Sequence, residues 1–99
     1  DTQYNKGISL YELERYEESI ACYDKAIRLD PEFSDTQYNK GISLYELERY
    51  EEAIRCYEEA IRLDPTLLEA WHKKGLVLKK LGRYEESILC FTKSTNLIL

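Results

Sequence analysis

Apolar residues recur along the chain at spacings of three and four, as on a helix that buries one face. One such series contains Tyr38, Ile42 and Tyr45, and the next contains Tyr50 and Ile54. A short polar segment separates the two series, which is typical of a turn. The pattern therefore predicts a pair of amphipathic helices joined by a short connection.

This two-helix pattern occurs three times with a period of 34 residues. Residues 1–33 and 35–67 are identical at all but six aligned positions, and a more diverged third copy reaches residue 99. A helix pair cannot bury its apolar face alone, so successive pairs stack and share a core. We predict one all-α domain over 1–99, built of unit one (1–33), unit two (34–67) and unit three (68–99).

The helix ends carry stop and start signals. The second helices of units one and two should stop just before Pro31 and Pro65, because proline lacks an N–H donor and disfavours helix in the residue before it. Ser34 and Thr66 are each followed three residues later by Gln or Glu, the pattern of a capping box. We expect these two residues to cap the first helices of units two and three.

The turn within each unit contains Glu14, Glu48 or Gly82 at equivalent positions. Only unit three has the glycine that a left-handed helix C-terminus prefers. If Glu14 and Glu48 adopt that conformation, each costs about 1 kcal/mol relative to glycine. Replacing Glu48 by glycine is therefore expected to stabilise the protein.

Unit two combines small and large residues at fixed spacings, namely Gly41, Leu44, Tyr45, Tyr50, Ala53, Ile54, Tyr57, Ala60, Leu63, Asp64 and Pro65. This set resembles the tetratricopeptide repeat (TPR) pattern, and the resemblance extends over nearly the whole chain. It implies an α-solenoid of three antiparallel helix pairs, wound into a right-handed superhelix. The first helix of each unit would line a concave groove, and the second would form the convex back. Gly41 and Ala53 would let the two helices of a unit approach closely.

The same resemblance implies a non-catalytic scaffold that binds a protein or peptide partner in the groove. The positions that would face the groove are Tyr4, Asn5, Ile8, Tyr11, Tyr38, Asn39, Ile42, Tyr45, His72, Lys73, Leu76 and Lys79. Tyrosine suits such a surface because its ring supplies contact area and its hydroxyl a hydrogen bond. Helical spacing places Tyr4, Ile8 and Tyr11 in one row, which Tyr38, Ile42 and Tyr45 repeat, and we call this row the tyrosine stripe. An alternative is that neighbouring units or a flanking segment cover the stripe.

One branch of the family grips the carboxylate tails of heat-shock chaperones with Lys, Asn, Asn, Lys and Arg at five positions. The matching residues here are Tyr4, Ile8, Asn39, Glu69 and Lys73. Only Asn39 agrees outright, and Glu69 reverses a charge. The sequence therefore argues against a chaperone tail as the ligand.

The chain has a net charge of −5, which argues against nucleic acid as the main partner because a phosphate backbone demands a basic surface. Charge is unevenly distributed: residues 1–34 and 35–67 each hold eight acids and four bases, whereas 68–99 hold three acids and six bases. The third unit has a basic cluster of His72, Lys73, Lys74, Lys79, Lys80 and Arg83. This cluster either attracts an acidic stretch of a partner or forms a solvated polar face.

Cys22, Cys56 and Cys90 recur at the repeat period, so they derive from one duplicated position. Equivalent helices are separated by an intervening helix, too far apart for a disulfide, and the spacing matches no zinc motif. We interpret them as small packing residues in a reducing, cytoplasmic environment. His72 has no nucleophile signature near it, and no phosphate-binding glycine loop is present, so we expect neither an enzyme nor a bound cofactor.

A second hypothesis concerns the two ends of the array. The chain opens in a first helix and closes on Leu97, Ile98 and Leu99, without the polar capping helix that repeat arrays use. We expect either a fragment of a longer array or self-association through an end interface at these three residues. The near-identity of units one and two favours a recent or engineered duplication and allows swapped pairing. No apolar run is long enough to predict a membrane span or a signal peptide.

Overall fold

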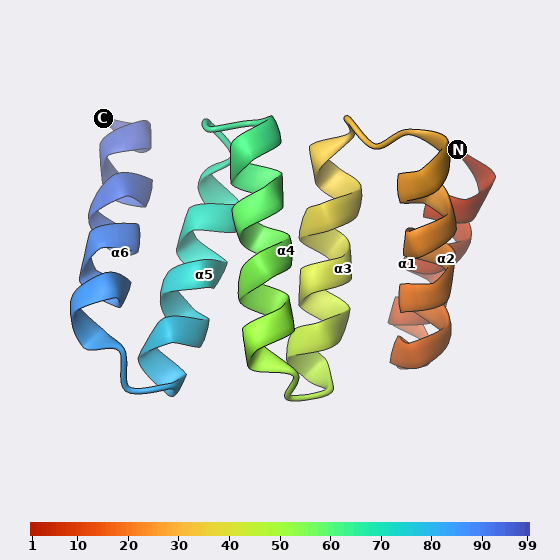
Figure 1. Cartoon of the computed structure of the whole chain (residues 1–99), viewed down its shortest axis with the longest axis horizontal. Coiled ribbons are helices and arrows are strands. Elements are labelled where there is room, and N and C mark those ends of the chain that lie inside the picture. The colour runs from red at the N-terminus through yellow and green to blue at the C-terminus, as the bar shows by residue number, and fades with distance from the viewer.

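The computed structural model describes residues 1–99 and contains six α-helices and no strand. They are α1 (Thr2–Glu12), α2 (Tyr16–Leu29), α3 (Ser34–Glu46), α4 (Tyr50–Leu63), α5 (Leu68–Lys80) and α6 (Tyr84–Ile98). Each helix packs against the next one in the chain and runs antiparallel to it, with α1 behind α2 in this view (Figure 1). This confirms the predicted all-α solenoid, and α2 and α4 end ahead of their Asp-Pro pairs as expected. None of the six helices combines the length and the apolarity that crossing a membrane would require.

The three turns within the units share one geometry. Glu14 and Glu48 have a φ of 60° and Gly82 has a φ of 77°, so all three are left-handed. In unit two the backbone N–H of Arg49 donates to the carbonyl of Leu44 at 2.9 Å, which satisfies a carbonyl that the end of α3 leaves free. The prediction that two glutamates occupy a conformation suited to glycine is therefore confirmed.

The predicted capping boxes are wrong. Phe33 and Leu67 occupy the N-cap positions of α3 and α5, and neither helix start receives a side-chain hydrogen bond. Ser34 lies one residue too far along, inside the first turn of α3. Thr66 lies in the preceding loop, where its N–H and Oγ1 donate to Oδ1 of Asp64 at 3.1 and 2.6 Å. The carboxylate that closes the Asp-Pro loop thus uses the hydroxyl that the capping box needed.

A glycine in each first helix lies under an aromatic ring of the second helix. The pairs are Gly7 with Tyr23, Gly41 with Tyr57, and Gly75 with Phe91. These contacts confirm that the helices of a unit approach closely at the glycine. Between units the core is continuous, since buried residues of α2, α3, α4, α5 and α6 form one cluster around Leu44, Tyr57 and Leu78.

The three cysteines are buried free thiols in α2, α4 and α6. Burial raises the pKa of Cys56 to about 11 and also raises the pKa of Cys90. Both thiols therefore stay protonated at neutral pH and pack as small apolar groups. Cys56 and Cys90 belong to the same core cluster that joins the units.

Candidate functional site

The predicted groove positions lie on α1, α3 and α5, and every one of them is at least partly exposed. The first aromatic position of each unit packs against a ring of its own second helix. The ring centroids are 6.2 Å apart for Tyr4 and Tyr23, 5.9 Å for Tyr38 and Tyr57, and 5.5 Å for His72 and Phe91. These contacts hold each first-helix ring against its own unit, while Tyr4 and Tyr38 remain partly exposed and His72 is exposed.

A second row of aromatic contacts runs along the other end of the helices. The Tyr45 ring lies 5.6 Å from that of Tyr50, and Tyr11 has the same contact in unit one. Ile42 and Tyr45 also pack against the core cluster while remaining half-buried. The tyrosine stripe is therefore partly covered by the protein itself, and ring contacts hold its side chains in place. In unit three Lys79 replaces the tyrosine of this row, and Leu76 is half-buried like Ile8 and Ile42.

Asn39 is held by a side chain of the neighbouring unit. Its Nδ2 donates to the hydroxyl oxygen of Tyr4 at 2.9 Å, which links α3 to α1 across the stripe. The second N–H and Oδ1 of Asn39 have no protein partner, so the amide can still pair with a peptide backbone. Asn5 is exposed and makes no side-chain hydrogen bond within the chain.

Tyr38 belongs to the tyrosine stripe and also lines a cavity on the side of unit three. Burial, reinforced by the nearby charge of Glu69, raises its pKa to about 12. The Tyr38 hydroxyl is therefore neutral at physiological pH and can donate as well as accept a hydrogen bond.

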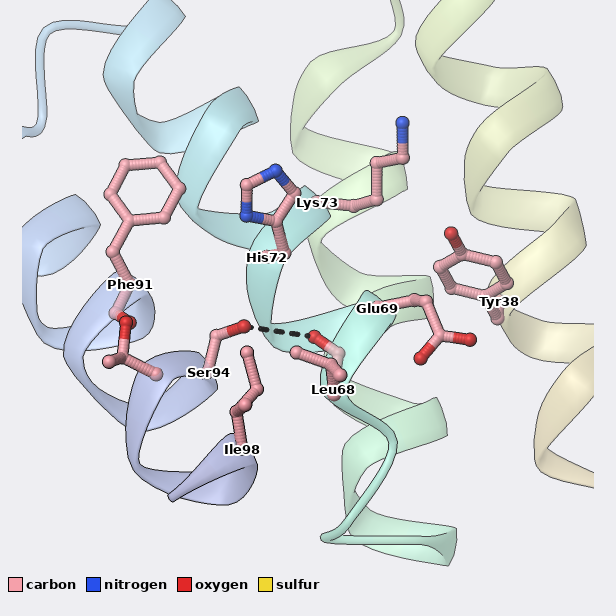
Figure 2. A pocket seen from close by; sticks show the side chains of 9 residues that line it. Tyr38, Leu68, Glu69, His72, Lys73, Phe91, Ser94 and Ile98 are labelled. Atoms are coloured by element: carbon pink, nitrogen blue, oxygen red, sulfur yellow. Dashed lines mark hydrogen bonds between the residues drawn. The ribbon is translucent and has the colours of Figure 1, made fainter.

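The cavity lies between α3, α5 and α6 and has a volume of about 660 Å³ (Figure 2). Its lining is largely apolar at the base, where Ser94 donates to the carbonyl of Leu68 at 3.4 Å, and carries charged groups at one side. This combination of an apolar hollow and a few polar groups is typical of a binding pocket. The lining residues are Tyr38, Leu68, Glu69, His72, Lys73, Phe91, Ser94, Thr95 and Ile98.

Unit one shows which group packs on the residue that aligns with His72. There the ring of Phe33 packs edge-on against Tyr4, with centroids 5.2 Å apart. Tyr4 aligns with His72 by the repeat period, but unit one has no preceding helix to supply the wall that Tyr38 forms in the cavity. The contact therefore shows that an aromatic side chain can pack at this position of a first helix.

The basic cluster of unit three separates into two groups. Lys74 pairs with Glu58 at 3.1 Å, and Arg83 pairs with glutamates of α4 and α6, so these two cations connect structural elements. Lys73, Lys79 and Lys80 make no ion pair within the chain, although Nζ of Lys80 lies 5.8 Å from the centre of the Tyr45 ring. This second group, with the exposed His72, is free to meet an acidic partner.

The sequence predicted Tyr38, His72 and Lys73 as groove residues, and the structure brings them together at the cavity. The sequence did not predict that α6 and the start of α5 complete the wall of the cavity. Phe91 could have been predicted from the repeat, because it aligns with Tyr57, whose ring packs on Tyr38 in unit two. Of the three residues expected at an end interface, Ile98 lines the cavity, Leu97 is half-buried and Leu99 is exposed. The chain has no cluster of three or more His, Cys, Asp or Glu side chains arranged to hold a metal ion.

A family model described as tetratricopeptide repeat matches residues 4–67 and, overlapping them, 38–93. The chain belongs to the tetratricopeptide repeat family. Among curated proteins nothing matches the chain.

Solved TPR structures share the fold. A crystal structure of MamA superposes with a TM-score of 0.95 at 23% identity, covering 96% of this chain and 56% of MamA. The second TPR domain of Spaghetti (RPAP3), bound to the HSP90 peptide SRMEEVD, gives 0.93 at 25% identity, covering 97% and 89%. The Arabidopsis OM64 TPR domain gives 0.94 at 22% identity, covering 97% and 79%. This chain therefore spans a little over half of the MamA structure that it matches, and the shared TPR fold is confirmed.

Proposed function

We propose that this TPR array is a non-catalytic interaction module that holds a peptide or partner helix in the groove lined by α1, α3 and α5. The observation that carries the proposal is the cavity of about 660 Å³ that opens beside the rigid aromatic stripe. A pre-formed hollow next to immobilised rings lets a partner bind with little loss of side-chain entropy in this protein. The TPR family and its solved relatives are typically interaction modules, which supports this class of function.

The cavity favours a large apolar side chain as the partner's anchor. Phe33 packs on Tyr4, the residue that aligns with His72, which supports an aromatic anchor beside His72. Lys73 and Lys79 form no ion pair within the chain, so acidic residues near the anchor would find a complementary surface. We propose that the ligand is a segment with one aromatic or large aliphatic residue among acidic neighbours.

A free acidic C-terminus of the kind seen on the second TPR domain of RPAP3 is not the ligand that we propose. Glu69 lies in the cavity wall at a position where tail-binding relatives carry a lysine. Tyr4 and Ile8 occupy two positions where tail-binding relatives need a cation or an amide. The single matching residue, Asn39, uses one of its two amide N–H groups on the hydroxyl of Tyr4.

Other classes of function receive less support. The net charge of −5 disfavours nucleic acid, and the one histidine packs on Phe91 instead of facing a nucleophile. Three buried free thiols suit a reducing compartment such as the cytoplasm, which is the location that we propose.

A peptide-display selection on the purified chain tests this function. Thr95 lines the cavity from an exposed position on α6, so Thr95→Trp should fill the hollow without disturbing the core. The control is Asn96→Trp, because Asn96 is exposed, adjacent, and not part of the cavity wall. Both variants keep the same helix and the same change in side-chain size.

We expect the enriched peptides to share an apolar residue with acidic neighbours. Their affinity should fall at least about tenfold for Thr95→Trp, equivalent to about 1.4 kcal/mol, and stay unchanged for Asn96→Trp. A selection without enrichment, or peptides that bind the cavity-filled variant as well as the parent chain, would overturn the proposal.

A further inference from the structure

The outer face of α6 is apolar and uncovered. Tyr84 and Ile88 are 62% and 61% exposed. The equivalent residues of unit two are far less accessible, since Tyr50 is half-buried and Ile54 is 4% exposed. The difference arises because α5 packs over α4, whereas α6 stands at the edge of the row with α5 as its neighbour (Figure 1).

At both internal junctions the covering element is the first helix of the next unit. Where α3 covers α2, the hydroxyls of Ser19 and Ser43 lie 2.7 Å apart in a buried hydrogen bond. An ion pair closes the edge of the same junction, with Arg49 3.4 Å from Glu17. The corresponding pair at the next junction, between Arg83 and a glutamate of α4, measures 3.2 Å.

The chain also exposes a first-helix face that no unit covers. Leu13, at the end of α1, is 66% exposed, whereas its equivalent Leu47 packs against the core cluster. Ser9 is exposed, whereas its equivalent Ser43 is fully buried against α2. This face of α1 therefore has the residues of a junction and no partner within the chain.

We propose that the outer face of α6 binds α1 of a second copy of this chain, head to tail, and repeats the packing of α3 on α2. Two of the junction features have both partners. The serine pair is not one of them, because Ser87 is already buried and its Oγ donates to the carbonyl of Gly75 at 2.9 Å. Glu85 would meet Arg15, as Glu17 meets Arg49, and the apolar pair of Tyr84 and Ile88 would cover Leu13.

One ion pair of the internal junctions is also missing. Asp24 pairs with Lys40 at 2.7 Å and Glu58 pairs with Lys74 at 3.1 Å, but the third position is Thr92. The new junction therefore lacks one ion pair of the internal ones and should be weaker and reversible. The proposed contacts lie along the outer face of α6. They do not involve Leu97, Ile98 or Leu99, the residues at which the sequence predicted an end interface.

Charge favours the head-to-tail arrangement over like ends meeting. α6 carries Glu85 and Glu86 in its first turn and Lys93 as its one base. In the head-to-tail arrangement the first of these glutamates meets Arg15, an opposite charge, as Glu17 meets Arg49. Two α6 faces would instead bring the glutamates of both copies together.

Sedimentation velocity of the whole chain over a wide concentration range tests the proposal. The parent chain should shift from its 11.8 kDa monomer toward twice that mass and above as concentration rises. Ile88→Glu should remain monomeric. The matched control is Leu89→Glu, since Leu89 is 70% exposed on the same helix but aligns with Ala21 and Arg55, which stay exposed at the internal junctions. This control should associate like the parent.

A mixing experiment fixes the orientation. Leu13→Glu blocks the α1 face and Ile88→Glu blocks the α6 face, so each variant alone should be monomeric. Mixed at equal concentrations, one intact face of each kind remains, and the mixture should form dimers and nothing larger. A parent chain that is monomeric throughout would overturn the proposal. Association that Leu13→Glu leaves intact, or a mixture that stays monomeric, would overturn it as well.

Discussion

The ring of Tyr57 lies directly against the backbone of Gly41, so a Cβ atom built on that glycine would stand 2.5 Å from Cε1 of the ring. Tyr57 is fully buried in the core cluster, so the ring has nowhere to move. We expect Gly41→Ala to destabilise the protein by about 1–3 kcal/mol through overpacking. Urea unfolding, monitored by circular dichroism, measures this loss of stability.

The direction of that change is informative, because alanine favours a helix over glycine by about 1 kcal/mol. Asn5→Ala, at an exposed position of α1, supplies the control for helix propensity alone and should cost nothing. A gain in stability for Gly41→Ala would show that the ring does not limit the approach of α3 and α4.

The Tyr57 hydroxyl is buried and has no hydrogen-bond partner. Unit three has Phe91 at the equivalent position and keeps the same contact with its glycine. Removing an unsatisfied buried hydroxyl should therefore help, and we expect Tyr57→Phe to stabilise the protein by about 1 kcal/mol. Tyr84→Phe, at an exposed ring, is the matched control and should change nothing. A loss of stability for Tyr57→Phe in thermal or urea unfolding would contradict the burial of an unpaired hydroxyl.

Glu48 has a φ of 60°, which strains a residue with a Cβ atom. Glu48→Gly should stabilise the protein by about 1 kcal/mol, since glycine adopts this conformation freely. The reverse change, Gly82→Glu, should destabilise unit three by a similar amount. Glu46→Gly, within the helical last turn of α3, should instead cost about 0.5–1 kcal/mol. The same sign for both glutamate variants in a denaturation titration would refute the strain argument.

Burial raises the pKa of Cys56 from 9.0 to about 11 and that of Tyr38 from 10.0 to about 12. Both groups are neutral in the folded state and ionise more easily when unfolded, so the unfolded chain releases protons first. The contribution of these two groups to the free energy of unfolding is fully present below about pH 9, and it is lost as pH rises toward their folded-state pKa values. We expect the urea midpoint to fall steadily between pH 9 and pH 11, and to fall less steeply in Tyr38→Phe. A midpoint that stays level across this range would contradict the pKa values.

Much of the fold could be predicted from the repeat, because each unit reuses the same glycine, ring and proline at the same spacing. The residues at which the helices start could not be predicted in this way. Ser34 and Thr66 match a capping sequence, but the Asp-Pro loops before them set where the backbone becomes helical. A local motif cannot reveal such competition for a hydroxyl.

The groove stripe was also predictable, since helical spacing places Tyr38 and Ile42 on one face. The cavity and the link between Asn39 and Tyr4 were not, because both depend on how separate helices pack. The sequence could not predict which cations of the basic cluster form ion pairs, because this also depends on how separate helices pack. Lys74 pairs with Glu58 on a different helix, and spacing within α5 does not distinguish it from Lys73.

The central claim is that the cavity beside the aromatic stripe accepts an apolar anchor with acidic neighbours. Its most direct test is an NMR titration of the isotope-labelled chain with the acetylated peptide Glu-Glu-Phe-Glu-Glu, alongside a peptide in which alanine replaces phenylalanine. We predict saturable shifts centred on the amides of His72, Phe91 and Ile98, and none with the alanine peptide. Equal shifts with both peptides, no saturable shift, or shifts centred on α2 and α4 would contradict the account.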